Sequence, residues 1–212
     1  MINSQKFSVE CRQCERLASF LDEVKTDNPD YFCKPVPEFG DPEATLLVVG
    51  LAPGMHGANR SGRPFTGDHA GILLYQTLFD HGFASKPESL AADDGLELLD
   101  CRITNAVKCL PPQNKPTAAE INTCRNFLRE ELLHLPENSV ILALGTIAHK
   151  SIIASFGLRQ VEYKFAHEAE FELPGGRILL DSYHCSAYNT STKRLTPEMF
   201  NRVFARAREI IG

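Results

Sequence analysis

The sequence of 212 residues lacks any long hydrophobic run. No apolar stretch approaches the about 18 residues that a membrane-spanning helix needs. The segment from Met1 to Lys6 also lacks the apolar centre of a signal peptide. These absences argue against a membrane-spanning or a secreted protein. We therefore expect a soluble, cytoplasmic protein.

The chain has no excess of positive charge. It contains 22 Lys and Arg residues against 27 Asp and Glu residues, which gives a formal net charge of −5. This balance argues against bulk attraction to nucleic acid or to an anionic membrane. It leaves room for a local basic groove, because binding depends on the charges at the contact face.

No internal repeat, low-complexity tract or clear linker divides the sequence. A chain of this length that is 43% hydrophobic can bury a sizeable core. We therefore expect one domain over residues 1–212.

Predicted strands and helices alternate along the chain. Apolar runs predict strands over residues 45–49, 102–107, 140–144 and 177–181, the last preceded by a hairpin over 161–173. Amphipathic patterns predict helices over residues 12–24, 70–81, 118–135 and 147–156, and a last helix that begins at Thr196. Thr117 and Glu120 have the spacing of a capping box at the start of the third helix. This alternation predicts a three-layer α/β/α sandwich around a central, mostly parallel four-stranded sheet.

The segment of residues 50–68 is rich in glycine but matches no nucleotide fingerprint. It contains neither G-x-G-x-x-G nor G-K-[ST], which argues against dinucleotide and P-loop chemistry. It follows a predicted strand, at the place where open α/β sheets bind ligands. Its glycines allow the main chain to approach a flat or anionic ligand, and Phe65 offers an aromatic face.

Four of the seven cysteines could form one metal site. Cys11 and Cys14 form a C-x2-C pair, Cys109 ends a strand, and Cys124 lies one turn into the capped helix. Four thiolates suit zinc and an iron–sulfur cluster equally well, and the spacing favours neither. An accidental C-x2-C pair is the alternative. The remaining cysteines, Cys33, Cys101 and Cys185, are interpreted as small core or incidental thiols.

Polar side chains also follow two other strands. His184 lies just past a strand end, in a loop that continues to Asn189 and then to Lys193 and Arg194, a composition suited to a sugar–phosphate backbone. Asn105 lies in an otherwise apolar strand, where an unpaired amide would cost about 1–3 kcal/mol. Such an amide has either a structural partner or a ligand.

Together these segments resemble the uracil-DNA glycosylase superfamily. The resemblance rests on Gly50-Leu-Ala-Pro-Gly54, Gly62-Arg-Pro-Phe-Thr-Gly67, the run from Thr104 to Cys109, and His184-x-Ser-x-x-Asn189, in this order and with the four cysteines. Leu51, Ala52, the insert of residues 56–60 and the segment of residues 32–41 resemble its iron–sulfur branch, family 5 (type b). The match runs from Cys11 to about Asn189. Cys185 and Ala187 stand where relatives commonly have prolines.

The resemblance implies a monofunctional DNA repair glycosylase. It would hydrolyse the N-glycosidic bond of uracil, and of other deaminated bases such as hypoxanthine, and leave an abasic site after base flipping. Main chain at Gly50, Leu51 and Ala52 would line the base, and Phe65 would stack on it. Asn105 would read the pyrimidine edge, and His184 would donate a hydrogen bond to the base O2 as charge develops there.

Other site residues are implied in the same way. Ala52 stands where other branches have the Asp or Asn that positions water, so Asn59 or Asn105 would take that role. A structural [4Fe–4S] cluster on Cys11, Cys14, Cys109 and Cys124 would tie the N-terminal helix to the central one. DNA would be bound by a monomer, through backbone contacts from Arg60, Arg63, Gly145, Ser186, Asn189, Lys193 and Arg194.

Two other functions remain open from the sequence. The first is a cysteine hydrolase that uses Cys185 beside His184, although neighbouring residues on an extended strand point to opposite faces. The second is a non-catalytic, metal-containing module that binds nucleotides or DNA. This module would need Phe65 and the cysteines but neither Asn105 nor His184.

Overall fold

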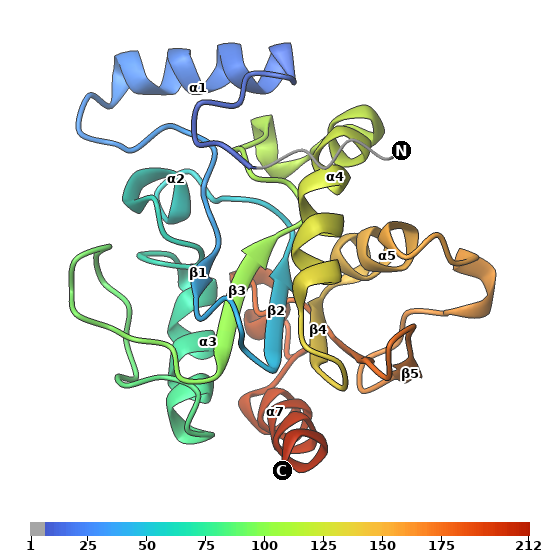
Figure 1. The fold of residues 1–212 in the computed structure, drawn as a ribbon. Helices are drawn as coiled ribbons and strands as arrows, with labels where there is room; N and C mark the ends of the chain where they lie inside the picture. The colour runs from blue at the N-terminus through green and yellow to red at the C-terminus, as the bar shows by residue number, and fades with distance from the viewer. Residues whose placement is uncertain (1–6) are drawn as a thin grey trace.

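Four parallel strands form the centre of the sheet in the computed structural model, which describes residues 7–212 (Figure 1). Their spatial order is β3 (Cys101–Asn105), β2 (Leu46–Gly50), β4 (Val140–Leu144) and β6 (Ile178–Ser182). Every residue of β2 and β4 is buried, as expected for apolar runs that are covered on both faces. The predicted parallel centre is therefore confirmed.

Two short antiparallel strands extend this centre, so the sheet has six strands rather than the four predicted. β1 (Phe39–Gly40) pairs with β3, and β5 (Glu170–Glu172) pairs with β6. A two-residue strand has no periodicity to detect. β5 and β6 form the predicted hairpin, but its first arm is shorter than the expected 161–173: residues 160–162 form the 3-10 helix η2 (Gln160–Glu162), and residues 163–169 form no strand.

Helices cover both faces of the sheet. α3 (His69–Asp80) and α7 (Pro197–Ile211) pack on the face that contains Leu46 and Val48. α4 (Ala118–His134) and α5 (Thr146–Ser155) pack on the face that contains Leu47 and Val49. Alternate residues of one strand thus enter two separate cores, and the predicted three-layer sandwich is confirmed (Figure 1).

α1 (Glu15–Asp27) lies beyond the end of the sheet toward which the β2 and β3 arrows point (Figure 1). Its apolar side packs with the segment after β3 and with α4, in a third core that includes Leu17, Val107 and Phe127. Cys109 and Cys124 belong to the same core. The N-terminal helix is therefore joined to the main body around cysteines.

The helix starts agree with their predicted capping residues. Thr117 and Glu120 form the capping box of α4, and Thr196 caps α7 with Pro197 in the first turn. The short helices α2 (Ala58–Ser61) and α6 (Ala187–Ser191) and the 3-10 helix η1 (Pro112–Asn114) were not predicted. Within residues 7–212, no helix has the length and apolar character to cross a bilayer.

Candidate active site

A pocket of about 450 Å³ opens where the parallel strands end. Its walls come from Leu51 and Ala52 after β2, Asn105 at the end of β3, Gly145 after β4 and His184 after β6. The chain leaves β2 toward β3 but leaves β4 in the opposite direction toward β6, and such a crevice is the usual ligand site of an open α/β sheet. The other wall residues are Gly54, Ala58, Phe65, Asp68, Ala70, Asn114, Leu144, Thr146, Ile147, Phe165, Tyr183, Ser186, Asn189 and Arg194.

Gly50 allows two wall side chains to meet. A Cβ atom at this position would lie 2.4 Å from Asn105 Oδ1 and 2.6 Å from Phe65 Cζ. Any other residue at position 50 would therefore displace the amide, the aromatic ring or both. Phe65 itself has a φ of 56°, a left-handed conformation that a bulky residue rarely adopts.

Asn105 presents a polar group that the protein leaves unsatisfied. The residue is 3% exposed, and its Oδ1 atom is buried without a hydrogen-bond partner among residues 7–212. An unmade hydrogen bond of this kind costs about 1–3 kcal/mol. Because the amide borders the pocket, a ligand with a matching edge would restore the bond.

His184 is an uncharged ring at neutral pH. Burial lowers its pKa to about 4, since the apolar surroundings disfavour the cation. Its Nδ1 atom is buried without a partner among residues 7–212, so Nε2 is the nitrogen open to the pocket. The ring stacks on that of Phe65, with centroids 6.0 Å apart and 29° between the planes.

The loop that carries His184 is held by hydrogen bonds in place of prolines. Asn189 Nδ2 donates to the His184 carbonyl at 2.8 Å, and Ser186 caps α6 by accepting from the Asn189 N–H. Cys185 is fully buried in the core, and burial raises the pKa of its thiol. The hydrolase alternative is therefore not supported, because Cys185 faces the core while His184 faces the pocket.

Asp68 also lines the pocket, although no sequence pattern predicts it there. Its Oδ1 accepts the Gly71 N–H at 2.9 Å and so caps α3. Its Oδ2 lies over the glycine loop, where a Cβ atom at Gly57 would be 2.6 Å away. Burial raises the pKa of this carboxyl. In a sequence, an acidic residue directly before a helix is interpreted as a helix cap. This interpretation gives no reason to expect the same residue in a pocket.

Two expected site residues lie elsewhere. Asn59 is fully buried, does not line the pocket, and its Nδ2 donates to Cys33 Sγ at 3.5 Å. Arg63, expected to contact DNA, is only 6% exposed and forms an ion pair with Asp94 at 2.8 Å. This expectation was wrong, because a buried and paired guanidinium cannot reach a phosphate.

The other expected DNA contacts are accessible. Gly145, Ser186, Asn189 and Arg194 line the pocket. The Arg194 guanidinium lies 4.6 Å from the centre of the Tyr183 ring. Arg60 and Lys193 are exposed outside the pocket walls.

The four expected cysteine ligands line a second, mostly apolar pocket. Cys14 is the N-cap of α1, and Cys11 precedes it. Cys109 follows β3, and Cys124 lies in α4, where its Sγ accepts the Lys108 N–H at 3.4 Å. Cys33, Cys101 and Cys185 do not line this pocket. Among residues 7–212, no three His, Cys, Asp or Glu side chains are arranged to hold a single metal ion.

Known proteins resemble this chain over most of its length. The model of the Uracil DNA glycosylase superfamily matches residues 37–208. A type-5 uracil-DNA glycosylase of Thermus thermophilus is 50% identical over 207 residues, which cover 95% of this chain and 94% of the relative. The type-5 enzyme of Pyrobaculum aerophilum is 41% identical over 203 residues, 94% of this chain and 88% of the relative. A type-4 uracil-DNA glycosylase of Sulfurisphaera tokodaii is 32% identical over 180 residues, 79% of this chain and 72% of the relative.

Proposed function

The chain belongs to the uracil-DNA glycosylase superfamily, and we propose that it removes uracil from DNA by hydrolysing the bond between the base and deoxyribose. One observation carries this proposal most strongly. A single pocket combines an aromatic ring, an unsatisfied amide and a neutral imidazole, contributed by Phe65, Asn105 and His184. These groups suit a flat, uncharged base with polar edges, which has to leave the helical stack to reach them.

Asn105 would read the edge of the flipped base. Its side-chain amide offers one acceptor and two donors, and uracil presents an N–H donor beside a carbonyl acceptor. Hypoxanthine presents the same pair of groups on its six-membered ring. We therefore include hypoxanthine as a second substrate in the proposal. Phe65 would stack on the face of either base.

His184 would stabilise the leaving base. As the glycosidic bond breaks, its electron pair moves onto the base, and negative charge develops on O2 of uracil. In the tautomer that carries its proton on Nε2, the neutral imidazole would donate this N–H to the oxygen without giving up the proton. Such a donor in a site with little water stabilises a developing anion strongly.

Asp68 would hold the attacking water. Ala52, which lines the pocket, has no polar side-chain atom for this purpose, and Asn59 lies outside the pocket. The Asp68 carboxylate lines the pocket, so it can accept a hydrogen bond from water and stabilise positive charge on the sugar. Water would add to the sugar carbon, its proton would pass to Asp68, and the base anion would take a proton from solvent. Because water and not a lysine amine attacks the sugar, the backbone stays intact and the product is an abasic site.

Replacing Asp68 by Asn tests this role. Asparagine keeps an oxygen that can cap α3 but loses the charge, so the single-turnover rate of uracil release should fall by ~10²–10⁴. In the wild type, the rate should rise with pH through the pKa of Asp68, which burial places above the ordinary carboxyl value. Above that pKa the carboxylate is ionised and the rate should level off. The His184 ring becomes charged only near pH 4.

The assay is release of uracil from a labelled duplex, followed by cleavage at the abasic site and gel separation. The Asp68→Asn variant should also lose the acidic limb of the pH profile. Wild-type rates in this variant would exclude Asp68 as the group that holds water. A wild type that releases no uracil would contradict the proposed function itself.

We also propose that Cys11, Cys14, Cys109 and Cys124 hold a [4Fe–4S] cluster. Two observations support the fit: the four thiols surround one pocket, and its other walls are largely apolar. When bound, the cluster would supply a covalent cross-link between the segment before α1 and the body of the protein. It would take no part in bond cleavage, because it belongs to a different pocket from His184 and Asp68.

The cluster proposal predicts a brown protein with about four irons per chain. Single Cys→Ala replacements at positions 11, 14, 109 and 124 should each lower the iron content and the melting temperature. Cys33→Ala and Cys101→Ala are the matched controls and should keep the iron, because these thiols lie outside the pocket. Stoichiometric zinc without iron in anaerobically prepared protein would contradict the cluster.

Unpaired cations and an exposed aromatic ring belong to the segment that follows His184, three residues of which, Ser186, Asn189 and Arg194, line the pocket. Lys193 and Arg194 form no ion pair among residues 7–212. Tyr188, on α6, is 71% exposed. We propose that the cations bind backbone phosphates, which anchor DNA without reading its sequence. Tyr188 would stack in the gap that the flipped base leaves.

The monomeric state and the cytoplasmic location stay predictions.

Neutralising Lys193 and Arg194 together tests the proposed DNA path. The Lys193→Gln/Arg194→Gln protein should bind all duplexes more weakly, and its log–log salt slope should be smaller by ~2, since two phosphate contacts are lost. The control is Arg202→Gln/Arg206→Gln, because these arginines are paired with Glu168 and Glu170. An unchanged slope in the first variant would place the DNA path on another face.

A further inference from the structure

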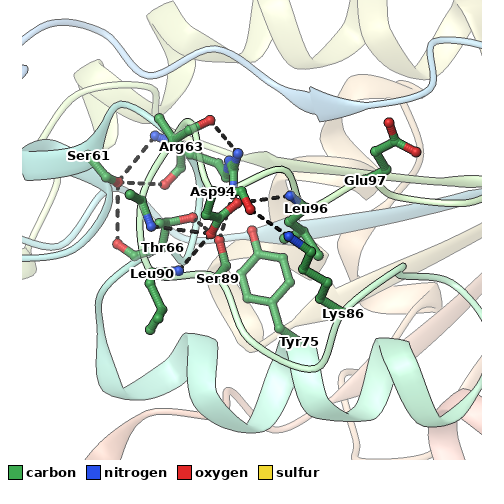
Figure 2. Close-up of polar contacts among 12 residues, drawn as sticks. Ser61, Arg63, Thr66, Tyr75, Lys86, Ser89, Leu90, Asp94, Leu96 and Glu97 are labelled. Atoms are coloured by element: carbon green, nitrogen blue, oxygen red, sulfur yellow. Dashed lines mark hydrogen bonds and ion pairs between the residues drawn. The ribbon is translucent and has the colours of Figure 1, made fainter.

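Arg63 lies in a buried polar network behind the pocket wall. Its Nη1 donates to Asp94 at 2.8 Å and to Ser89 Oγ at 3.0 Å, and its Nη2 donates to the Ala92 carbonyl. The guanidinium also stacks over the Phe39 ring at 4.4 Å. Figure 2 shows Arg63 and Asp94 facing each other, with Ser89 and Thr66 beside them. None of these residues lines the pocket.

The network forms hydrogen bonds with residues on both sides of Phe65. Tyr75 donates its hydroxyl to the Pro64 carbonyl at 2.7 Å, and Thr66 Oγ1 lies 2.7 Å from Ser89 Oγ. Ser61 Oγ accepts the Arg63 N–H at 3.3 Å, and the carbonyls of Gly57, Arg63 and Thr66, 3.0 to 3.3 Å away, are alternative acceptors for its one hydroxyl hydrogen. Hydrogen bonds therefore fix Arg63, Pro64 and Thr66, the neighbours of Phe65. The Phe65 ring itself lines the pocket.

Phe65 needs this support because its backbone is strained. A left-handed conformation is unfavourable for a bulky residue and persists only where the surroundings impose it. Without the network, the segment of residues 63–66 would relax toward an ordinary conformation. The ring would then leave its place beside Asn105 and His184.

Asp94 organises the partner side of the network. Its two carboxylate oxygens accept the N–H groups of Leu90, Ala91 and Leu96 as well as the Arg63 guanidinium. These bonds shape the loop that carries Ser89 and the Ala92 carbonyl. Burial by itself would raise the pKa of Asp94, but the hydrogen bonds from Arg63 and the backbone outweigh it and lower the pKa. Asp94 therefore stays ionised opposite Arg63.

We propose that Asp94 is a positioning residue for base excision, which acts through Arg63 to hold the Phe65 ring at the pocket wall. This inference rests on the proposed function, because Phe65 is assigned there to the flipped base. It also gives the loop around Asp94 a role in the reaction rate, although that loop does not border the pocket.

A double-mutant cycle between Asp94 and Phe65 tests the proposal. Asp94→Asn keeps an acceptor for the backbone but leaves the buried Arg63 charge unpaired. It should lower the single-turnover rate of uracil release by ~10–10², the effect of a misplaced binding group, with little change in the Kd for undamaged duplex. In a Phe65→Leu background the same replacement should change the rate less than about twofold, since the ring it positions is absent.

Two further variants separate positioning from stability. Ser89→Ala removes the hydroxyl shared by Arg63 and Thr66 and should give a smaller rate loss with the same dependence on Phe65. Arg177→Met removes another buried guanidinium. Arg177 directly precedes β6, and its guanidinium donates to the carbonyls of Pro174 and Leu135. It should lower the melting temperature without changing the rate.

The outcomes are distinct. An Asp94→Asn protein at the wild-type rate, or one with the same loss in both Phe65 backgrounds, would overturn the positioning role while leaving the proposed function intact. If Asp94→Asn does not fold, the Ser89→Ala cycle decides the question by the same criterion. A wild type that releases no uracil would overturn both proposals.

Discussion

The close approach of Phe65 and Asn105 over Gly50 is the constraint on which the pocket depends. Because Gly50 has no side chain, the Phe65 ring and the Asn105 amide occupy the space where its Cβ would be. The parallel register pairs Gly50 with Asn105, which fixes the amide at the sheet edge. The ring is carried by a left-handed backbone at residue 65, and we propose that the Arg63–Asp94 network holds the segment in that conformation.

Burial has a second effect on the site, because it separates the proton affinities of its two titratable groups. The same loss of water lowers the pKa of His184 and raises the pKa of Asp68. At neutral pH the imidazole is uncharged and can donate a hydrogen bond to a developing anion, whereas Asp68, once ionised, can attract positive charge. Groups whose environments push their pKa values apart commonly take opposite roles in a reaction. The buried Asn105 Oδ1 has no partner among residues 7–212, and under the proposed function a bound base would supply the missing hydrogen bond.

Much of the fold and part of the site follow from local sequence signals. Apolar runs located the four parallel strands, and Thr117 with Glu120 located the start of α4. Asn105 and His184 stand out in the sequence as polar residues at strand ends, and both line the pocket. Asp68 was missed because its capping role explains it locally. Arg63 was misassigned because its partner, Asp94, lies 31 residues away in a loop without periodicity, so its burial leaves no sequence pattern.

The proposed chemistry depends above all on a neutral His184 that donates a hydrogen bond to the base as it leaves. The most direct measurement is the single-turnover rate of uracil release by the His184→Ala protein, compared with its affinity for the same duplex. The rate should be lower by ~10²–10³, the usual effect of losing one donor to a developing anion, with nearly unchanged affinity. Uracil release at the wild-type rate by this protein would contradict this role of His184.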